Sequence, residues 1–114
     1  MVTKSEVEAF LNTFKAKIEV FDVIFLNRDK NLRALIDLEM TSVNRKELLK
    51  ELRVEDYFRG PTKDVDNGPD LWEFGRLLKQ KEVYIKITIG MMNKPVICIS
   101  FHLAERAIAY PFKK

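Results

Sequence analysis

Strict alternation of apolar and polar side chains in two segments near the C-terminus is the feature that most constrains the fold. The apolar positions are Val83, Ile85, Ile87 and Ile89 in the first segment and Ile97, Ile99, Phe101 and Leu103 in the second. Neighbouring side chains of a strand point to opposite faces, so each segment is predicted to be a strand with one apolar face. Residues 71–78 form a third such segment, with Trp72 and Phe74 in core positions. The connections are too short for parallel crossovers, which favours an antiparallel meander.

The N-terminal half shows helical spacing instead. Apolar residues recur at helical intervals from residue 7 to residue 18, and Ser5 with Glu8 fits a capping box at the start of this helix. Three further elements are predicted: a strand at 20–26 and two short amphipathic helices at 32–38 and 44–52. The Gly, Pro and Asn-Gly content of residues 59–70 predicts a loop.

Helices followed by a meander predict an α+β fold, with the N-terminal helices packed on one face of an antiparallel sheet. The chain has 114 residues, which is the size of one domain covering residues 1–114. One histidine and one cysteine argue against a zinc site, and the four glycines do not form a phosphate-binding loop. We therefore expect neither a metal nor a nucleotide cofactor. With no apolar run long enough for a membrane span or a signal peptide, we expect a cytoplasmic protein without a membrane partner.

Charge is distributed unevenly along the chain. Residues 76–114 contain eight basic and two acidic residues, a net charge of +6, whereas the first 75 residues carry −3. This asymmetry indicates an anionic partner for the C-terminal part, most commonly a nucleic acid. A basic surface that only contacts solvent explains the charge equally well.

The polar face of the predicted sheet gathers several reactive groups. It carries Glu73, Tyr84, Lys86, Ser100 and His102. A solvated side of a half-covered sheet is the simplest interpretation of this set. The alternative is a site in which a phenol, an ammonium group and an imidazole act together.

The strand register decides how close these groups lie. Apolar residues must pair with apolar ones, and the register that places Ile89 opposite Ile97 meets this condition. It also places Tyr84 opposite His102 and Lys86 opposite Ser100, with Cβ atoms about 5 Å apart in each pair. A two-residue slip would set Lys86 against His102 instead, and either register brings the three groups together.

Two other segments contain residue types that could form a site. Cys98 and His102 lie four residues apart along a strand, about 13 Å, which is too far for a thiol–imidazole dyad. The segment from Asp64 to Gly68 resembles a calcium-binding loop, but its glycine is misplaced and no glutamate closes it, so we interpret it as a turn.

Four segments, taken in order and with their spacing, resemble the motility quorum-sensing regulator (MqsR) family of toxins. These toxins are RelE-like mRNA interferases of bacterial type II toxin–antitoxin modules. The segments are Asp56-Tyr-Phe-Arg59, Leu71-Trp72, Val83-Tyr-Ile-Lys-Ile87 and Val96-Ile-Cys-Ile-Ser-Phe101. The resemblance implies a small RelE-like α+β domain whose sheet binds RNA and cuts it without a metal ion. It also implies a cognate antitoxin protein that holds the toxin inactive.

The family's functional positions can be matched one by one. Tyr84 is the family's tyrosine. Arg59 and His102 stand where the family has lysine, and Glu73 stands where it has glutamine. The chain also continues beyond His102 for a dozen residues that the resemblance does not assign.

These observations lead to one functional hypothesis, a metal-free endoribonuclease toxin, and to two rival functions. The ordinary pKa of histidine suits proton transfer near neutrality, so His102 is predicted to act as acid or base. Tyr84 is its predicted partner or a hydrogen-bond donor to phosphate, Lys86 and Arg59 stabilise charge, and Glu73 serves as a base or pairs with Lys86. Lys63, Arg76, Ser100 and Lys113 are predicted to bind RNA. The rivals are a non-catalytic module that binds RNA or protein and a regulatory protein without a nucleic-acid partner.

Overall fold

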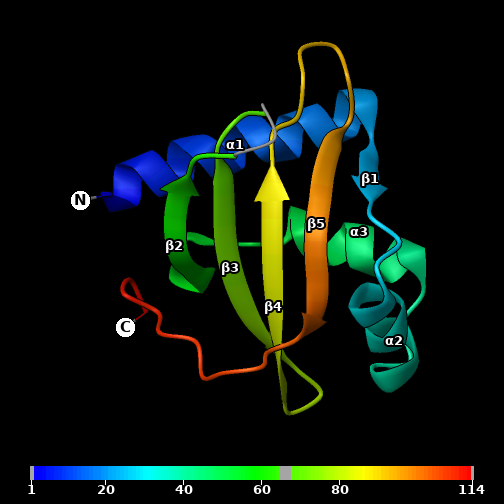
Figure 1. The fold of residues 1–114 in the computed structure, drawn as a ribbon. Helices are drawn as coiled ribbons and strands as arrows, with labels where there is room; N and C mark the ends of the chain where they lie inside the picture. Colours follow the sequence, from blue (N-terminus) through cyan, green and yellow to red (C-terminus); the bar gives the residue numbers. More distant parts are fainter. Residues whose placement is uncertain (1, 65–67, 114) are drawn as a thin grey trace.

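Helices lie on one face of the sheet, as the sequence predicts, and the described residues form five strands, one more than predicted. A computed structural model describes residues 2–64 and 68–113. The elements follow in the order α1 (Lys4–Phe21), β1 (Val23–Phe25), α2 (Asp29–Asp37), α3 (Ser42–Lys50), a short 3-10 helix (Val54–Asp56), β2 (Tyr57–Thr62), β3 (Leu71–Leu78), β4 (Lys81–Thr88) and β5 (Val96–Leu103). The strand order is β1-β5-β4-β3-β2, with β1 parallel to β5 and the other neighbours antiparallel (Figure 1). The fold is therefore α+β, and the predicted meander β3-β4-β5 is confirmed.

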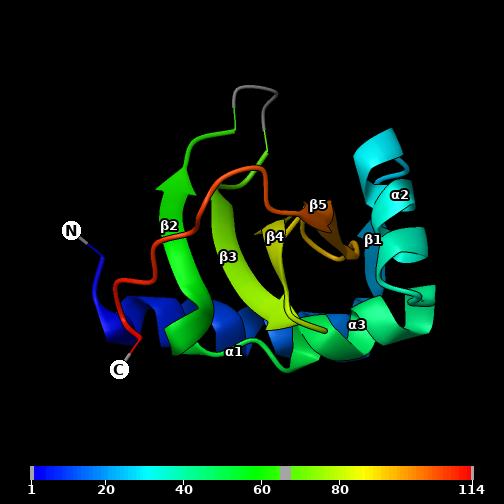
Figure 2. The same ribbon diagram turned by 90° about the horizontal axis from the view of Figure 1, so that it is seen from below.

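Helices α1 and α3 cover one face of the sheet, and α2 stands at its β1 edge (Figure 2). The predicted apolar stripe of α1 is confirmed, because Val7, Phe10, Leu11, Phe14 and Ile18 are all buried. They pack in one core with Phe74, Ile85, Ile87 and Phe101 of the sheet. Trp72 packs against this core too, with its ring stacked on that of Phe10 at 4.4 Å between centroids. The other face of the sheet has no helix lying across it, and we call it the open face.

The first helix differs from the prediction at both ends. Thr3 rather than Ser5 is the N-cap, and Glu6 completes the capping box. Thr3 and Glu6 have the same spacing as Ser5 and Glu8, so the pattern alone does not choose between them. The helix also continues to Phe21, so the predicted strand 20–26 shrinks to the three residues of β1. Helix propagation from the buried stripe overrides the β-propensity of this segment.

The predicted loop 59–70 is wrong in its first part, because residues 57–62 form the edge strand β2. Gly60 adopts a φ of 114°, and a Cβ there would lie 2.8 Å from the carbonyl oxygen of Leu71. The strand register shifts on both sides of Arg59. Glycine and proline therefore mark an irregular edge strand here, a position in which both residues are tolerated. Residues 65–67 of the predicted loop lie outside the described residues.

The predicted register between β4 and β5 is confirmed at one end of the strand pair and wrong at the other. Tyr84 pairs with His102 and Lys86 with Ser100, as predicted. The next pair is Ile87 with Cys98, so Ile99 is left as a bulge and the predicted Ile89–Ile97 pair does not form. The bulge moves Cys98 to the covered face, whereas Ile97 and Ile99 were predicted to lie there.

A buried asparagine holds this bulge. The side-chain amide of Asn31 in α2 donates to the carbonyl oxygens of Ile99 and Leu26, both at 2.9 Å. Its oxygen accepts from the backbone N–H of Phe101, also at 2.9 Å. Asn31 thus links α2 to the strand that carries Ser100 and His102, and it fixes the faces to which they point.

Candidate functional site

A groove of about 550 Å³ lies on the open face, across strands β2 to β5. It is lined by Arg28 and Lys30 at the N-terminal end of α2, by Phe58 and Arg59 of β2, by Tyr84 and Lys86 of β4, by Ser100 and His102 of β5, and by residues 104–108 after β5. Four of the five residues predicted to be catalytic line it, and the fifth, Glu73, contacts two of them. Period-two alternation on β4 and β5 brings Tyr84, Lys86, Ser100 and His102 to one face, as predicted.

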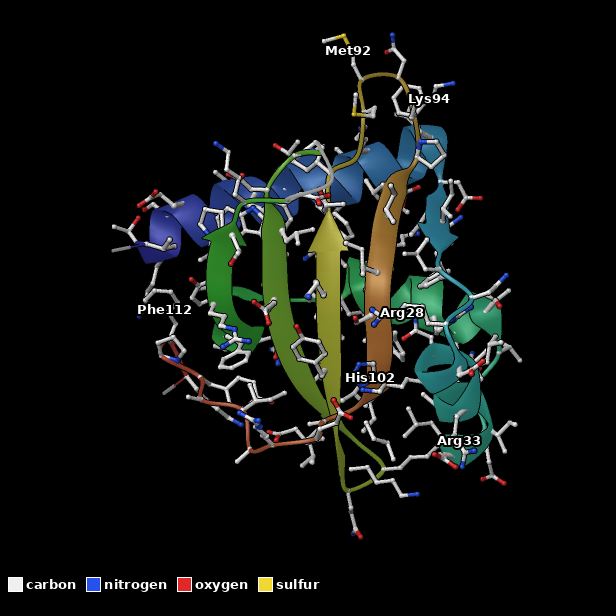
Figure 3. All side chains as sticks on the ribbon, viewed as in Figure 1. Arg28, Arg33, Met92, Lys94, His102 and Phe112 are labelled. Atoms are coloured by element: carbon white, nitrogen blue, oxygen red, sulfur yellow. The ribbon has the colours of Figure 1, made fainter. Side chains whose placement is uncertain are left out.

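Tyr84 and His102 are direct neighbours. They are paired across β4 and β5, and their ring centroids lie 5.3 Å apart. In Figure 3, His102 lies on the open side of β5. The phenol and the imidazole can therefore contact one ligand at the same time.

The hydrogen bond of His102 decides which of its nitrogens is free. Nδ1 lies 2.9 Å from the carbonyl oxygen of Leu103. A carbonyl oxygen only accepts hydrogen bonds, so Nδ1 carries the proton in this contact. The neutral ring then presents an unprotonated Nε2, which is the nitrogen that can accept a proton from a ligand in the groove.

Glu73 lies beneath Arg59 and Tyr84 and is only 4% exposed. Its carboxylate accepts from Arg59 Nε at 2.9 Å and from the Tyr84 hydroxyl at 2.5 Å. Its predicted surface ion pair with Lys86 is wrong, because the partner is Arg59. A carboxylate that is buried and occupied by two donors positions its neighbours and is poorly placed to take a proton from a ligand.

This network also sets the protonation of its two outer members. Burial, followed by the hydrogen bond to Glu73, raises the pKa of Tyr84 well above its ordinary value. The carboxylate of Glu73 raises the pKa of Arg59. Tyr84 therefore stays protonated at neutral pH and is not a general base, while Arg59 is a permanent cation whose side chain is 65% exposed at the groove.

Lys86 and Ser100 form the next cross-strand pair of the groove. The Ser100 hydroxyl is buried and accepts from Arg28 Nη1 at 3.1 Å. Within the described residues, the side chain of Lys86 makes no hydrogen bond or ion pair, so its ammonium group is available to a ligand. A single anion can contact Lys86 and His102 together, since the two residues line the same groove.

Three residues predicted to bind RNA do not line the groove. Arg76 lies on the covered side, where it donates to the carbonyl oxygen of Glu51 at 3.0 Å and faces Asp56. Lys63 follows β2 and is exposed. Lys113 lies near the C-terminal end, with its ammonium 5.1 Å from the Tyr110 ring. Only Ser100 of the four RNA-binding predictions is part of the groove.

The rejected thiol dyad is indeed absent. Cys98 lies on the covered face and is buried, away from the open-face side of β5 that carries His102. Burial raises the pKa of the Cys98 thiol to about 12. Cys98 is therefore a core residue in this fold.

Sequence reasoning missed the cations at the N-terminal end of α2 and the wall made by the C-terminal segment. Arg28 and Lys30 fall in a stretch that reads as a turn, and only the parallel pairing of β1 with β5 carries them to the groove. Residues 104–112, which we call the strap, run back across the sheet toward β2 (Figure 2). Glu82 anchors the strap, because its carboxylate accepts from the Ile108 N–H at 3.0 Å and from the Tyr110 hydroxyl at 2.9 Å. No periodicity in the sequence signals this anchor.

Comparison with known proteins gives no match: no family model, no curated protein and no solved structure is similar to this chain at a significant level. In the described part of the chain, no helix is long and apolar enough to cross a membrane. Residues 2–64 and 68–113 contain no group of three or more His, Cys, Asp or Glu side chains arranged to hold a metal ion. The groove is therefore the feature from which a function can be inferred.

Proposed function

We propose that this protein is an endoribonuclease that cleaves RNA by acid–base catalysis in the open-face groove. The observation that carries the proposal is the pairing of Tyr84 with His102 beside Lys86 and Arg59 in one basic groove. RNA contains its own nucleophile, the 2′-hydroxyl. A protein that moves two protons and stabilises the crowded phosphate is sufficient for its cleavage.

The geometry supports a distribution of roles. His102 Nε2 takes the proton of the 2′-hydroxyl, which then attacks the adjacent phosphorus. The bond to the 5′ oxygen breaks, and that oxygen takes a proton from a water molecule in the groove, while protonated His102 returns its proton to solvent. The products end in a 2′,3′-cyclic phosphate and a 5′-hydroxyl. Lys86 and Arg59 stabilise the charge on the phosphate oxygens.

Tyr84 and Glu73 support these groups. The Tyr84 phenol packs beside the imidazole, and its hydroxyl donates to a phosphate oxygen when it turns away from Glu73. Glu73 holds both Tyr84 and Arg59 in place. We assign Glu73 a positioning role, because its two oxygens are already occupied.

The biological context that we propose is a type II toxin–antitoxin module, in which the chain is a cytoplasmic mRNA interferase of the MqsR type. The support is the ordered resemblance of four segments together with the α+β fold that it implies. A cognate antitoxin would cover the open face or add a strand at the edge formed by β2. The bulged, Gly-Pro-containing β2 makes direct covering of the groove the simpler arrangement.

Expression in a host that lacks an antitoxin tests this function against its rivals. Growth arrest with new RNA ends, both relieved by His102→Ala, supports the nuclease. RNA binding without new ends supports the non-catalytic binding module. A protein that neither binds RNA nor arrests growth contradicts both and leaves a regulatory protein without a nucleic-acid partner.

A further inference from the structure

The groove has two ends, and the cations at the two ends differ in whether a buried carboxylate pairs with them. At the β2 end, Arg59 is already paired with the buried carboxylate of Glu73. At the α2 end, Arg28 donates to the neutral hydroxyl of Ser100, and among the described residues the ammonium group of Lys30 pairs only with Glu105 of the strap. The α2 end therefore holds positive charge that no buried acid compensates.

Glu105, which follows β5, forms an ion pair with Lys30 of α2. Its Oε2 lies 2.7 Å from Lys30 Nζ, and the two side chains are 63% and 54% exposed. An ion pair this exposed is screened by water and contributes little, so a competing anion can displace it. The pairing with Lys30 also lowers the pKa of Glu105, which keeps the carboxylate ionised.

The strap fixes Glu105 in this position. On one side, the N–H of Ala104 donates to the carbonyl oxygen of Glu82 at 2.8 Å. On the other, the Ile108 N–H and the Tyr110 hydroxyl bind the Glu82 carboxylate. Gly75 lies beneath the strap, where a Cβ would come within 2.6 Å of Ile108 and Tyr110. The strap therefore lies close to the sheet. It presents the Glu105 carboxylate to the cations at the N-terminal end of α2.

Arg28 is held beside the central residues of the groove. Ser100, which is only 2% exposed, accepts from its guanidinium and pairs across the strands with Lys86. Figure 3 shows Arg28 over β5 and Arg33 farther along α2, away from the sheet. A chain of phosphates that passes Lys86 and His102 meets Arg28 and Lys30 next.

We propose that Arg28 and Lys30 form a phosphate subsite for the nucleotide next to the cleaved bond, and that Glu105 occupies this subsite in the free protein. This inference rests on the proposed ribonuclease function. It assigns the strap a role in substrate selection: an RNA must supply a second phosphate to displace Glu105, so short substrates with one phosphate bind less well.

Binding of an uncleavable RNA tests the subsite without cleavage. The probe is a labelled 2′-O-methyl hexanucleotide, and the affinity is measured by fluorescence anisotropy at several salt concentrations. Lys30→Gln and Arg28→Gln should each weaken binding several-fold and reduce the slope of log affinity against log salt by about 0.7. Arg33→Gln, an equal charge change on the same helix, is the matched control and should change neither quantity comparably.

The Glu105 variant gives the sharper test. Glu105→Gln should strengthen hexanucleotide binding several-fold, and this gain should disappear when Lys30 is also replaced by Gln. Glu8→Gln on α1 controls for the general loss of a negative charge. A dinucleotide with one phosphate should bind the Glu105 variant and the wild type equally.

The outcomes separate this inference from the function on which it rests. If the wild type cleaves RNA but Lys30→Gln and Arg28→Gln bind the hexanucleotide like Arg33→Gln, the subsite is refuted and the nuclease stands. A Glu105→Gln variant that binds no better than Glu8→Gln also refutes it. If the wild type binds no hexanucleotide at all, both proposals fail.

Discussion

The two faces of the sheet bury their side chains by different means. On the covered face, Phe74, Ile85 and Phe101 are fully buried under helices. On the open face no helix lies across the sheet, yet Glu73, Ser100 and His102 are 4%, 2% and 8% exposed. Polar side chains contact them instead: Arg59 and Tyr84 contact Glu73, Arg28 contacts Ser100, and Tyr84 packs beside His102. Apolar burial holds the fold together on one face, and hydrogen bonds hold reactive groups in place on the other.

The largest loss of stability is expected from a substitution in the covered face. Phe101→Ala removes a fully buried ring and should lower the free energy of unfolding by about 3–5 kcal/mol, measured by urea denaturation. Phe101 and His102 are adjacent in the chain and lie on opposite faces of the sheet. Phe101→Ala and His102→Ala are therefore a matched pair. A loss below about 1 kcal/mol would show that the covered face is not the source of stability.

An intermediate loss of stability is expected when the buried carboxylate of the open face, Glu73, is replaced. Glu73→Gln keeps the shape but places an amide against Arg59 and Tyr84, and it should cost about 1–3 kcal/mol of unfolding free energy. Lys86→Gln on the same face, at a lysine without an ion pair, should stay within about 0.5 kcal/mol and serves as the control. Equal losses for the two variants would contradict the network described for Glu73.

The smallest effect on stability is expected at the strap. Gly75→Ala places a Cβ against the ends of two flexible side chains, Ile108 and Tyr110, and should cost about 1 kcal/mol by overpacking. Its main consequence should be a loosened strap, seen as faster proteolytic cleavage in residues 104–112. A strap as resistant as in the wild type would show that its close seat on the sheet does not depend on Gly75.

The comparison of the faces also shows what the sequence can predict. The bounds of β3 and β5 and the Tyr84–His102 pair were predictable, because alternation and the parity of apolar pairing restrict both. The Ile99 bulge was not, because the residue that holds it, Asn31, is distant in sequence and lies in α2. Local pattern carries no information about such a contact.

The candidate site divides in the same way. Tyr84, Lys86, Ser100 and His102 follow from alternation on two adjacent strands. The burial of Glu73 depends on β2, whose Gly60-Pro61 reads as a loop in the sequence. Arg28, Lys30 and Glu105 reach the groove through the parallel edge strand and the anchored strap, which are both tertiary features.

The most direct test of the account is the initial rate of RNA cleavage by purified wild type and His102→Ala, measured beside their unfolding free energies. Loss of a general acid–base group should lower the rate about 10²-fold or more. The unfolding free energy should fall by about 1–3 kcal/mol, less than for Phe101→Ala, because His102 is buried but lies on the open face. Cleavage at an unchanged rate by the His102→Ala variant would contradict the proposed site.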